Sequence, residues 1–141
     1  MSISITRRIQ FSAGHRIHRH ESVCRNIHGH CYVVYFTATA PELDDLGRVI
    51  DFSVLKEKLG GWVDANWDHG FLWHERDQDM KKVFEMLPEN KNFPMPYNPT
   101  AENMARYLIE VVGPTVLADT GVSLIEVRVH ETENCFAEAM L

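Results

Sequence analysis

Cysteine is scarce in this sequence, and long apolar runs are missing from it. Its 141 residues include only Cys24, Cys31 and Cys135, an odd number without the spacing of a disulfide framework. No run is long enough to span a bilayer, and the N-terminal stretch MSISITRRIQ lacks the apolar segment of a signal peptide. We therefore expect a single domain, residues 1–141, that folds without disulfides in a reducing, cytoplasmic setting.

A surplus of positive charge is also missing. The chain has 14 Lys and Arg against 20 Asp and Glu, which gives a net charge of −6 at pH 7. Nucleic-acid-binding surfaces are usually basic, so we expect no nucleic-acid partner. The first 30 residues are an exception, with five arginines and one acid, and they either bind an anion such as a phosphate ester or form a solvated edge. These arginines are Arg7, Arg8, Arg16, Arg19 and Arg25.

Side-chain periodicity predicts the secondary structure. Residues 2–12 alternate apolar and polar side chains, and residues 30–40 are rich in β-branched and aromatic ones, so each stretch predicts a strand. Between them lies a long polar connection of the kind that often carries function. The other predicted elements are a short strand ending the turn segment 41–51, helices over 52–63, 77–87 and from about 98–100 to 112, a proline-punctuated connection over 92–99, and a final hairpin of residues 121–131 and 135–141.

The order of these elements predicts the fold class. Two strand pairs flanking helices favour an α+β fold, in which an antiparallel sheet carries helices on one face. No internal repeat, low-complexity tract or second domain is visible. Such a sheet has an uncovered face and edges, and oligomerisation is a common way to cover them.

Histidines cluster where the second strand begins. His28 and His30 are two residues apart, so in a strand both side chains lie on the same face. His15 ends the first strand, and it comes alongside them if the two strands are neighbours. Three imidazole nitrogens suit Zn²⁺ and leave a fourth position open for water or substrate. His18 and His20 are further candidates, since spacing alone does not select the ligands.

Cys24 leaves two readings open. As a fourth ligand it would close the site, and the zinc would then be structural. As a free thiol beside an open zinc it would be catalytic, with its pKa lowered by the metal and nearby cations.

Four other acidic or basic residues are candidates for function. Asp68 and His69 follow the first predicted helix and either provide acid–base chemistry or simply end the helix, with Gly70 as a left-handed cap. Glu131, at the end of a predicted strand, either accepts a pair of N–H donors from a planar ring edge or is a solvated turn residue. Glu102 lies in a first helical turn, where the helix dipole already favours an acid.

In this order, the motifs FSAGH, CRNIHGH, GRVIDFSVLKEKL, DH, NPTAENMARYL and VRVHET resemble the 6-pyruvoyltetrahydropterin synthase family over most of the chain. The resemblance implies the tunnelling fold (T-fold), a four-stranded antiparallel sheet with two main helices on one face. It implies trimers that stack into a homo-hexamer, with active sites at subunit interfaces. It also implies zinc ligation by His15, His28 and His30, and a proton-abstracting, non-ligating role for Cys24.

The resemblance assigns the remaining positions as well. Asp68 and His69 match the acid–base pair, Glu131 matches the pterin anchor, and Thr100 and Glu102 match positions near the pterin pocket. The implied substrate is 7,8-dihydroneopterin triphosphate. The short gap from the cysteine to the HGH motif resembles the bacterial branch, which forms 6-carboxy-5,6,7,8-tetrahydropterin for queuosine biosynthesis and releases triphosphate and acetaldehyde.

Alternatives to this function remain open at the level of sequence. They are triphosphate elimination to the 6-pyruvoyl product, aldol cleavage of dihydroneopterin alone, and a non-catalytic zinc- or pterin-binding oligomer closed by Cys24. Two departures from the family pattern bear on pocket shape: Gly14 replaces the usual alanine, and the segment WDHGFLWHERD differs after its DH pair.

Overall fold

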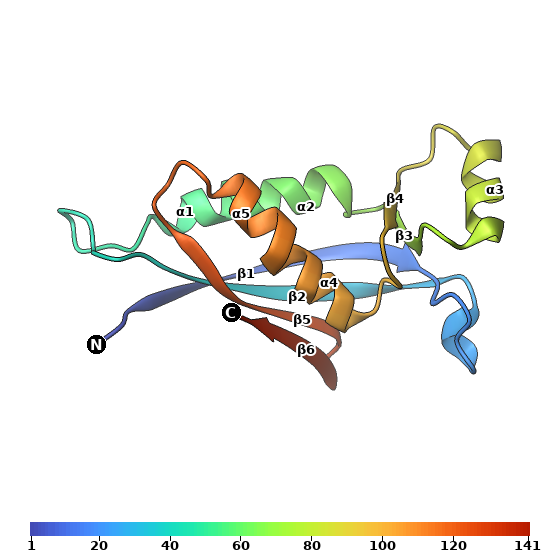
Figure 1. Cartoon of the computed structure of the whole chain (residues 1–141), viewed down its shortest axis with the longest axis horizontal. Helices are drawn as coiled ribbons and strands as arrows, with labels where there is room; N and C mark the ends of the chain where they lie inside the picture. The colour runs from blue at the N-terminus through green and yellow to red at the C-terminus, as the bar shows by residue number, and fades with distance from the viewer.

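The computed structural model describes all 141 residues and contains one sheet of six strands in the order β4-β3-β1-β2-β5-β6 (Figure 1). Strands β1, β2, β5 and β6 form an antiparallel set, whereas β3 pairs in parallel with β1 and β4 in parallel with β3. Strand β3 pairs with β1 only at Gly14 and His15, so the rest of β1 forms a free edge. The strands are β1 Ser4–His15, β2 His28–Thr39, β3 Phe71–His74, β4 Asn92–Met95, β5 Ser123–Thr132 and β6 Cys135–Met140.

Strands β1 and β2 pair along their full length, from Ser4 opposite Thr39 to His15 opposite His28. Alternate side chains point to opposite faces, so the apolar half of each strand gathers on one face. Phe11 of β1 and Tyr32 of β2 are opposite in register and stack with ring centroids 5.0 Å apart. This apolar face ends in the histidines, which continue the same alternation.

Two helical stretches cover that face of the sheet (Figure 1). Each contains one π-helical segment and begins at a residue whose side chain accepts a backbone N–H, Asp51 in the first and Thr100 in the second. The first comprises α1 Phe52–Leu55, the π segment Lys56–Gly60 and α2 Gly61–Asn66. The second comprises α4 Ala101–Tyr107, the π segment Leu108–Val112 and α5 Gly113–Val116.

Helix α3, Gln78–Met86, lies apart from this layer, beyond the ends of β3 and β4 (Figure 1). Its N-cap is Asp77, whose carboxylate accepts a hydrogen bond from the backbone N–H of Met80. None of the helices combines the length and apolar character that crossing a bilayer requires.

The core lies between the sheet and the two helical stretches. Its largest fully buried side chains include Trp67, Tyr32 and Phe36. Burial of such aromatic surface is the main favourable contribution to folding, at about 25 cal/mol per Å² of apolar area. His15 is 1% exposed and lies at one end of this core, so the packing that stabilises the fold also fixes a candidate ligand.

The α+β class and the four-stranded antiparallel sheet with two main helical stretches are confirmed. Two local predictions were wrong. The residues before Asp51 form turns rather than a short strand, and residues 92–95 of the predicted connection form β4. Pro94 is tolerated there because β4 lies at the edge of the sheet, where a missing N–H breaks no ladder bond.

Candidate active site

Three histidines converge at one end of the sheet, on the face that carries the helices. Pairing places His15 directly opposite His28, and His30 lies two residues further along β2 on the same face. The Nε2 atoms of His15 and His28 are 3.1 Å apart. One ring nitrogen from each of the three residues lies within 4.8 Å of the others, which is a spacing suited to a shared metal ion.

Backbone carbonyls fix the ring orientations. His15 Nδ1 lies 2.8 Å from the carbonyl oxygen of Pro99, and His28 Nδ1 lies 2.7 Å from that of Asn26. A carbonyl can only accept, so each Nδ1 carries the proton and each Nε2 presents a lone pair. Two lone pairs facing each other across 3.1 Å are repulsive without a cation between them. Such outer hydrogen bonds to ligating histidines are typical of zinc sites.

His30 completes the donor set. Its Nε2 is buried and has no hydrogen-bond partner. Leaving such a nitrogen without a partner is costly, and a metal bond would satisfy it. The three nitrogens therefore fit a zinc ion with a fourth position open.

The electrostatics keep the His15 and His30 rings neutral, which is the ligating form. Burial lowers the pKa of His15 to about 4; the Pro99 carbonyl opposes this shift, and His28 and His30 add to it. Burial also lowers the pKa of His30, while Glu131 opposes that shift. A desolvated imidazole disfavours its charged form, so at neutral pH the lone pairs are available for a metal.

Glu131 and Tyr32 line the same corner. Glu131 Oε1 lies 3.5 Å from His30 Nε2, and the Tyr32 hydroxyl lies 3.3 Å from His15 Nδ1. Burial raises the pKa of Tyr32, and the nearby Glu131 charge raises it further, so the phenol stays protonated. Glu131 was predicted to lie near the site, whereas Tyr32 was not. Tyr32 continues the i, i+2 alternation of His28 and His30, and this signal could have identified it.

Cys24 lies in a short 3-10 turn, Val23–Arg25, within the connection between β1 and β2. Its side chain is half-buried and not in a disulfide. Its carbonyl accepts a hydrogen bond from the backbone N–H of Ile17 at 2.9 Å. The group of convergent metal-ligating side chains consists of the three histidines and does not include Cys24. The geometry thus favours a free thiol over a fourth ligand.

Asp68 and His69 form a pair in the turn after α2. Asp68 Oδ2 lies 2.9 Å from His69 Nδ1, while its Oδ1 accepts from the backbone N–H of Ser12 at 3.0 Å. Burial alone would raise the pKa of Asp68, but the hydrogen bonds from Ser12 and His69 and the charge of Lys91 leave it lowered. The left-handed residue of this turn is His69, with φ 59°, and not Gly70, the cap in the alternative helix-end interpretation. The ionised Asp68 orients the exposed His69 ring.

The pair lies toward the other face of the sheet from the three histidines. His69 lines an open depression of about 560 Å³ together with Ser12, Cys31 and residues 28–30. Ser12 and Cys31 are opposite in register, with Oγ and Sγ 3.5 Å apart, on the face turned away from the helices. No hydrogen bond or ion pair joins Asp68 or His69 to Cys24 within the chain. Within one chain the Asp68–His69 pair is thus not bonded to Cys24.

Thr100 and Glu102 lie at the start of α4. The Thr100 hydroxyl caps the helix by accepting from the backbone N–H of Asn103 at 3.1 Å. Thr100 follows Pro99, whose carbonyl holds His15, so the cap supports the histidine group indirectly. Glu102 is exposed and makes no hydrogen bond or ion pair.

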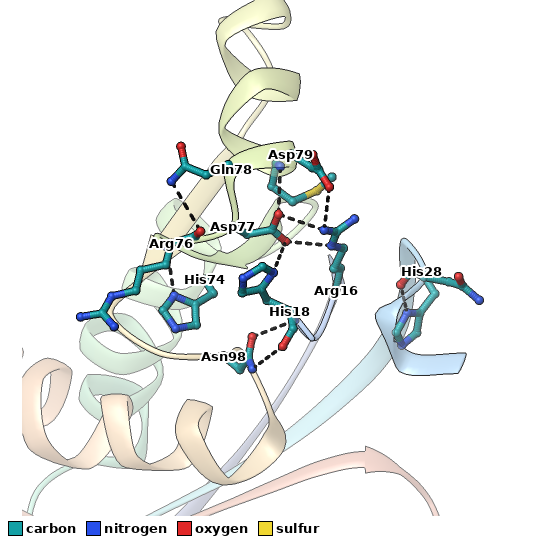
Figure 2. Close-up of polar contacts among 11 residues, drawn as sticks. Arg16, His18, His28, His74, Arg76, Asp77, Gln78, Asp79 and Asn98 are labelled. Carbon is teal, nitrogen blue, oxygen red and sulfur yellow. Dashed lines mark hydrogen bonds and ion pairs between the residues drawn. The ribbon is translucent and has the colours of Figure 1, made fainter. Parts of the chain in front are cut away.

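The five N-terminal arginines lie in different surroundings. Arg16 is engaged by Asp77 and Asp79 and is not free to bind an anion (Figure 2). Arg7 and Arg8 line a different hollow, bounded by the first helical stretch. Arg19 and Arg25, in the same connection as Cys24, are the arginines without an ion pair there.

The fold and the three-histidine group define an α+β protein with a candidate metal site where β1 ends and β2 begins. The model of the 6-pyruvoyl tetrahydropterin synthase family matches residues 4–140, and the chain belongs to that family. It is 41% identical over 136 residues to the 6-carboxy-5,6,7,8-tetrahydropterin synthase of Rickettsia typhi, across 96% of this chain and 99% of the relative. Identity to the protein of the same name from Haemophilus influenzae is 26%, across 95% and 96%.

Solved structures show the same fold. An uncharacterized protein from Wolinella succinogenes superposes with a TM-score of 0.84 at 22% identity, covering 99% of this chain and 98% of the other. The 6-pyruvoyl tetrahydropterin synthase of Caenorhabditis elegans superposes with a TM-score of 0.70 at 23% identity, covering 100% and 96%. The predicted T-fold is therefore confirmed.

Proposed function

We propose that this enzyme is a zinc-dependent lyase that converts 7,8-dihydroneopterin triphosphate to 6-carboxy-5,6,7,8-tetrahydropterin, with loss of triphosphate and acetaldehyde. The observation that carries the proposal is the convergence of three imidazoles beside Glu131, in which the buried Nε2 of His30 has no hydrogen-bond partner. Relatives aligned over nearly the whole chain are named for the 6-carboxy product. The short cysteine-to-histidine spacing points to the same product.

His15, His28 and His30 would hold the zinc. Zinc would act there as a Lewis acid toward the side-chain oxygens of the substrate, which favours proton loss at the adjacent carbons. Glu131 would accept hydrogen bonds from the 2-amino group and N3–H of the pterin ring. A carboxylate accepting two parallel N–H donors both fixes orientation and binds strongly.

Cys24 would abstract a proton from the substrate side chain, and His69 would deliver or remove a second one. Asp68 would stabilise the charged form of His69 while that proton is held. Within one chain His69 lies beside Ser12 and Cys31, whose side chains point away from the helices. The active site is therefore proposed to form between subunits, with Cys24 and the histidines from one chain and the Asp68–His69 pair from another.

The proposed assembly is a homo-hexamer of two stacked trimers. Both edges that would join subunits are available: β1 before Gly14 pairs on one side only, and β6 is the last strand of the sheet. Free strand edges are ready sites for pairing with another chain.

Replacement of Cys24 by Ala tests catalysis against a purely binding role. We expect zinc content, measured by elemental analysis, to stay near one per chain, because the thiol lies outside the three-histidine group. Turnover should fall by about a hundredfold or more, which is the scale of a lost proton-transfer group. Loss of zinc in the Cys24→Ala variant would contradict the proposal and favour a closed structural site.

A further inference from the structure

A buried ion pair holds the start of the connection that carries Cys24 (residues 16–25, the Cys24 loop) against α3 (Figure 2). Arg16 Nη2 donates to Asp77 Oδ1 at 3.0 Å, and Arg16 Nε lies 2.8 Å from Asp77 Oδ2. The Asp77 side chain is 1% exposed and that of Arg16 is 20% exposed. The Nη2–Oδ1 contact is a hydrogen bond, which constrains direction as well as distance, and the Nε–Oδ2 contact adds a close ion pair. Residue 16 therefore has a defined position relative to α3.

Asn98 holds the same loop from the other side. Its Oδ1 accepts from the backbone N–H of His18 at 2.8 Å, and its Nδ2 donates to the His18 carbonyl at 3.0 Å (Figure 2). The carbonyl of Asn98 in turn accepts from the side chain of Asn103 in α4 at 2.9 Å. The Asn98 side-chain amide thus makes two hydrogen bonds to the backbone of His18, as a neighbouring strand would. It connects the Cys24 loop to the start of α4.

These two contacts reach Cys24 through a single residue. Ile17 lies between Arg16 and His18 and is 9% exposed. Its backbone N–H donates to the Cys24 carbonyl at 2.9 Å. We infer that Asp77 and Asn98 are positioning residues for Cys24, acting through residues 16–18. The inference rests on the proposed role of Cys24 as the substrate-side base. Neither residue belongs to the three-histidine group, so the geometry separates thiol placement from metal binding.

The Asp77→Asn variant tests this inference, and Asp79→Asn is its matched control. Both remove one negative charge that faces Arg16, but Asp79 is 73% exposed and lies at 3.3 Å on the outer side. Asparagine also remains a good N-cap, so Asp77→Asn preserves the start of α3. In the zinc-loaded enzyme we expect kcat to fall by about tenfold or more for Asp77→Asn, because small misplacements of a reacting group are costly. KM and zinc content should stay within about threefold, and Asp79→Asn should match the wild type within about twofold.

A second readout does not depend on turnover. The alkylation rate of Cys24 by iodoacetamide, followed on its own peptide by mass spectrometry, reports how accessible the half-buried thiol is. At a pH well above the usual thiol pKa, we expect this rate to rise by about threefold or more in Asp77→Asn and in Asn98→Ala. The exposed Cys31 and Cys135 serve as internal controls and should not change.

The outcomes are distinguishable. An unchanged kcat in both variants, or a lower kcat with unchanged alkylation of Cys24, would overturn the inference. Faster alkylation of Cys24 in an enzyme whose wild type shows no turnover would support the positioning role and refute the proposed activity instead. If Asp77→Asn unfolds, as judged by its thermal transition, Asn98→Ala decides, because it removes only the bonds to His18.

Discussion

At the scale of single residues, the candidate site depends on which atom of each side chain is left without a partner. His15 and His28 each donate Nδ1–H to a carbonyl, so their Nε2 lone pairs converge, and the buried His30 Nε2 makes no hydrogen bond. The HxH motif and the strand alternation predict which residues meet. They do not predict the carbonyls of Asn26 and Pro99, because these come from irregular segments whose backbone path has no local sequence signature.

Glu131 provides a direct test of substrate recognition. Glu131→Gln keeps the size of the side chain but removes its charge, so the dissociation constant of a dihydropterin should rise by about tenfold or more, as expected for a lost charge-assisted hydrogen bond. Zinc content should be unchanged, since the ligands are the histidines. Isothermal titration calorimetry with 7,8-dihydroneopterin measures the effect. Glu133→Gln, at a nearby exposed position, is the control, and equal affinity in both variants would refute the anchoring role.

At the scale of elements, the close pairing of β1 and β2 positions the three ligands. Gly29 lies between His28 and His30, and a Cβ there would be 2.8 Å from the backbone oxygen of Ala13 and 3.3 Å from the Cα of Gly14. These are backbone atoms that cannot move without separating the strands. The glycine of the HGH motif is therefore required by the close approach of the backbones.

Gly29→Ala should weaken both the fold and the metal site. Overpacking of this kind costs about 2 kcal/mol in unfolding free energy, and we expect zinc affinity to fall by about tenfold or more as the two strands shift. Denaturant unfolding and zinc titration against a chelating dye measure the two effects. Gly61→Ala, where a Cβ would meet nothing within 4 Å in a helix, should instead stabilise by up to about 1 kcal/mol. Zinc affinity equal to the wild type in Gly29→Ala would contradict this account.

The long elements could be predicted because their periodicity extends over many residues. Strands β1 and β2 and the helix from Ala101 onward follow this pattern. Strands β3 and β4 have four residues each, which is too short for alternation to be distinguished from chance. The contact of Asp77 with the Cys24 loop joins residues 61 positions apart, and that of Asn98 joins residues 80 positions apart. No local sequence pattern predicts such contacts.

At the scale of the whole molecule, one chain presents two half-sites on opposite faces of the same sheet end. The three histidines and Glu131 face the helices, while His69 lies with Cys31 on the other face. The proposed mechanism needs both groups at one substrate, so it requires an oligomer. We expect the mass in solution to be six times the 16.3 kDa of the chain, measured by light scattering.

Mixing two inactive variants tests the shared site. Cys24→Ala and His69→Ala subunits, unfolded and refolded together in equal amounts with zinc, should regain about a quarter of wild-type activity, because random assembly pairs an intact Cys24 with an intact His69 at that frequency. Each variant refolded alone is the control and should remain inactive. No recovery on mixing, with hexamers formed, would place both residues of a functional site in one chain.

The most direct test of the central claim is the identity of the product. Zinc-loaded protein is incubated anaerobically with 7,8-dihydroneopterin triphosphate, and the products are identified by mass spectrometry. The account predicts 6-carboxy-5,6,7,8-tetrahydropterin together with acetaldehyde and triphosphate. A 6-pyruvoyl product that retains the terminal carbons, or unchanged substrate in the presence of bound zinc, would contradict it.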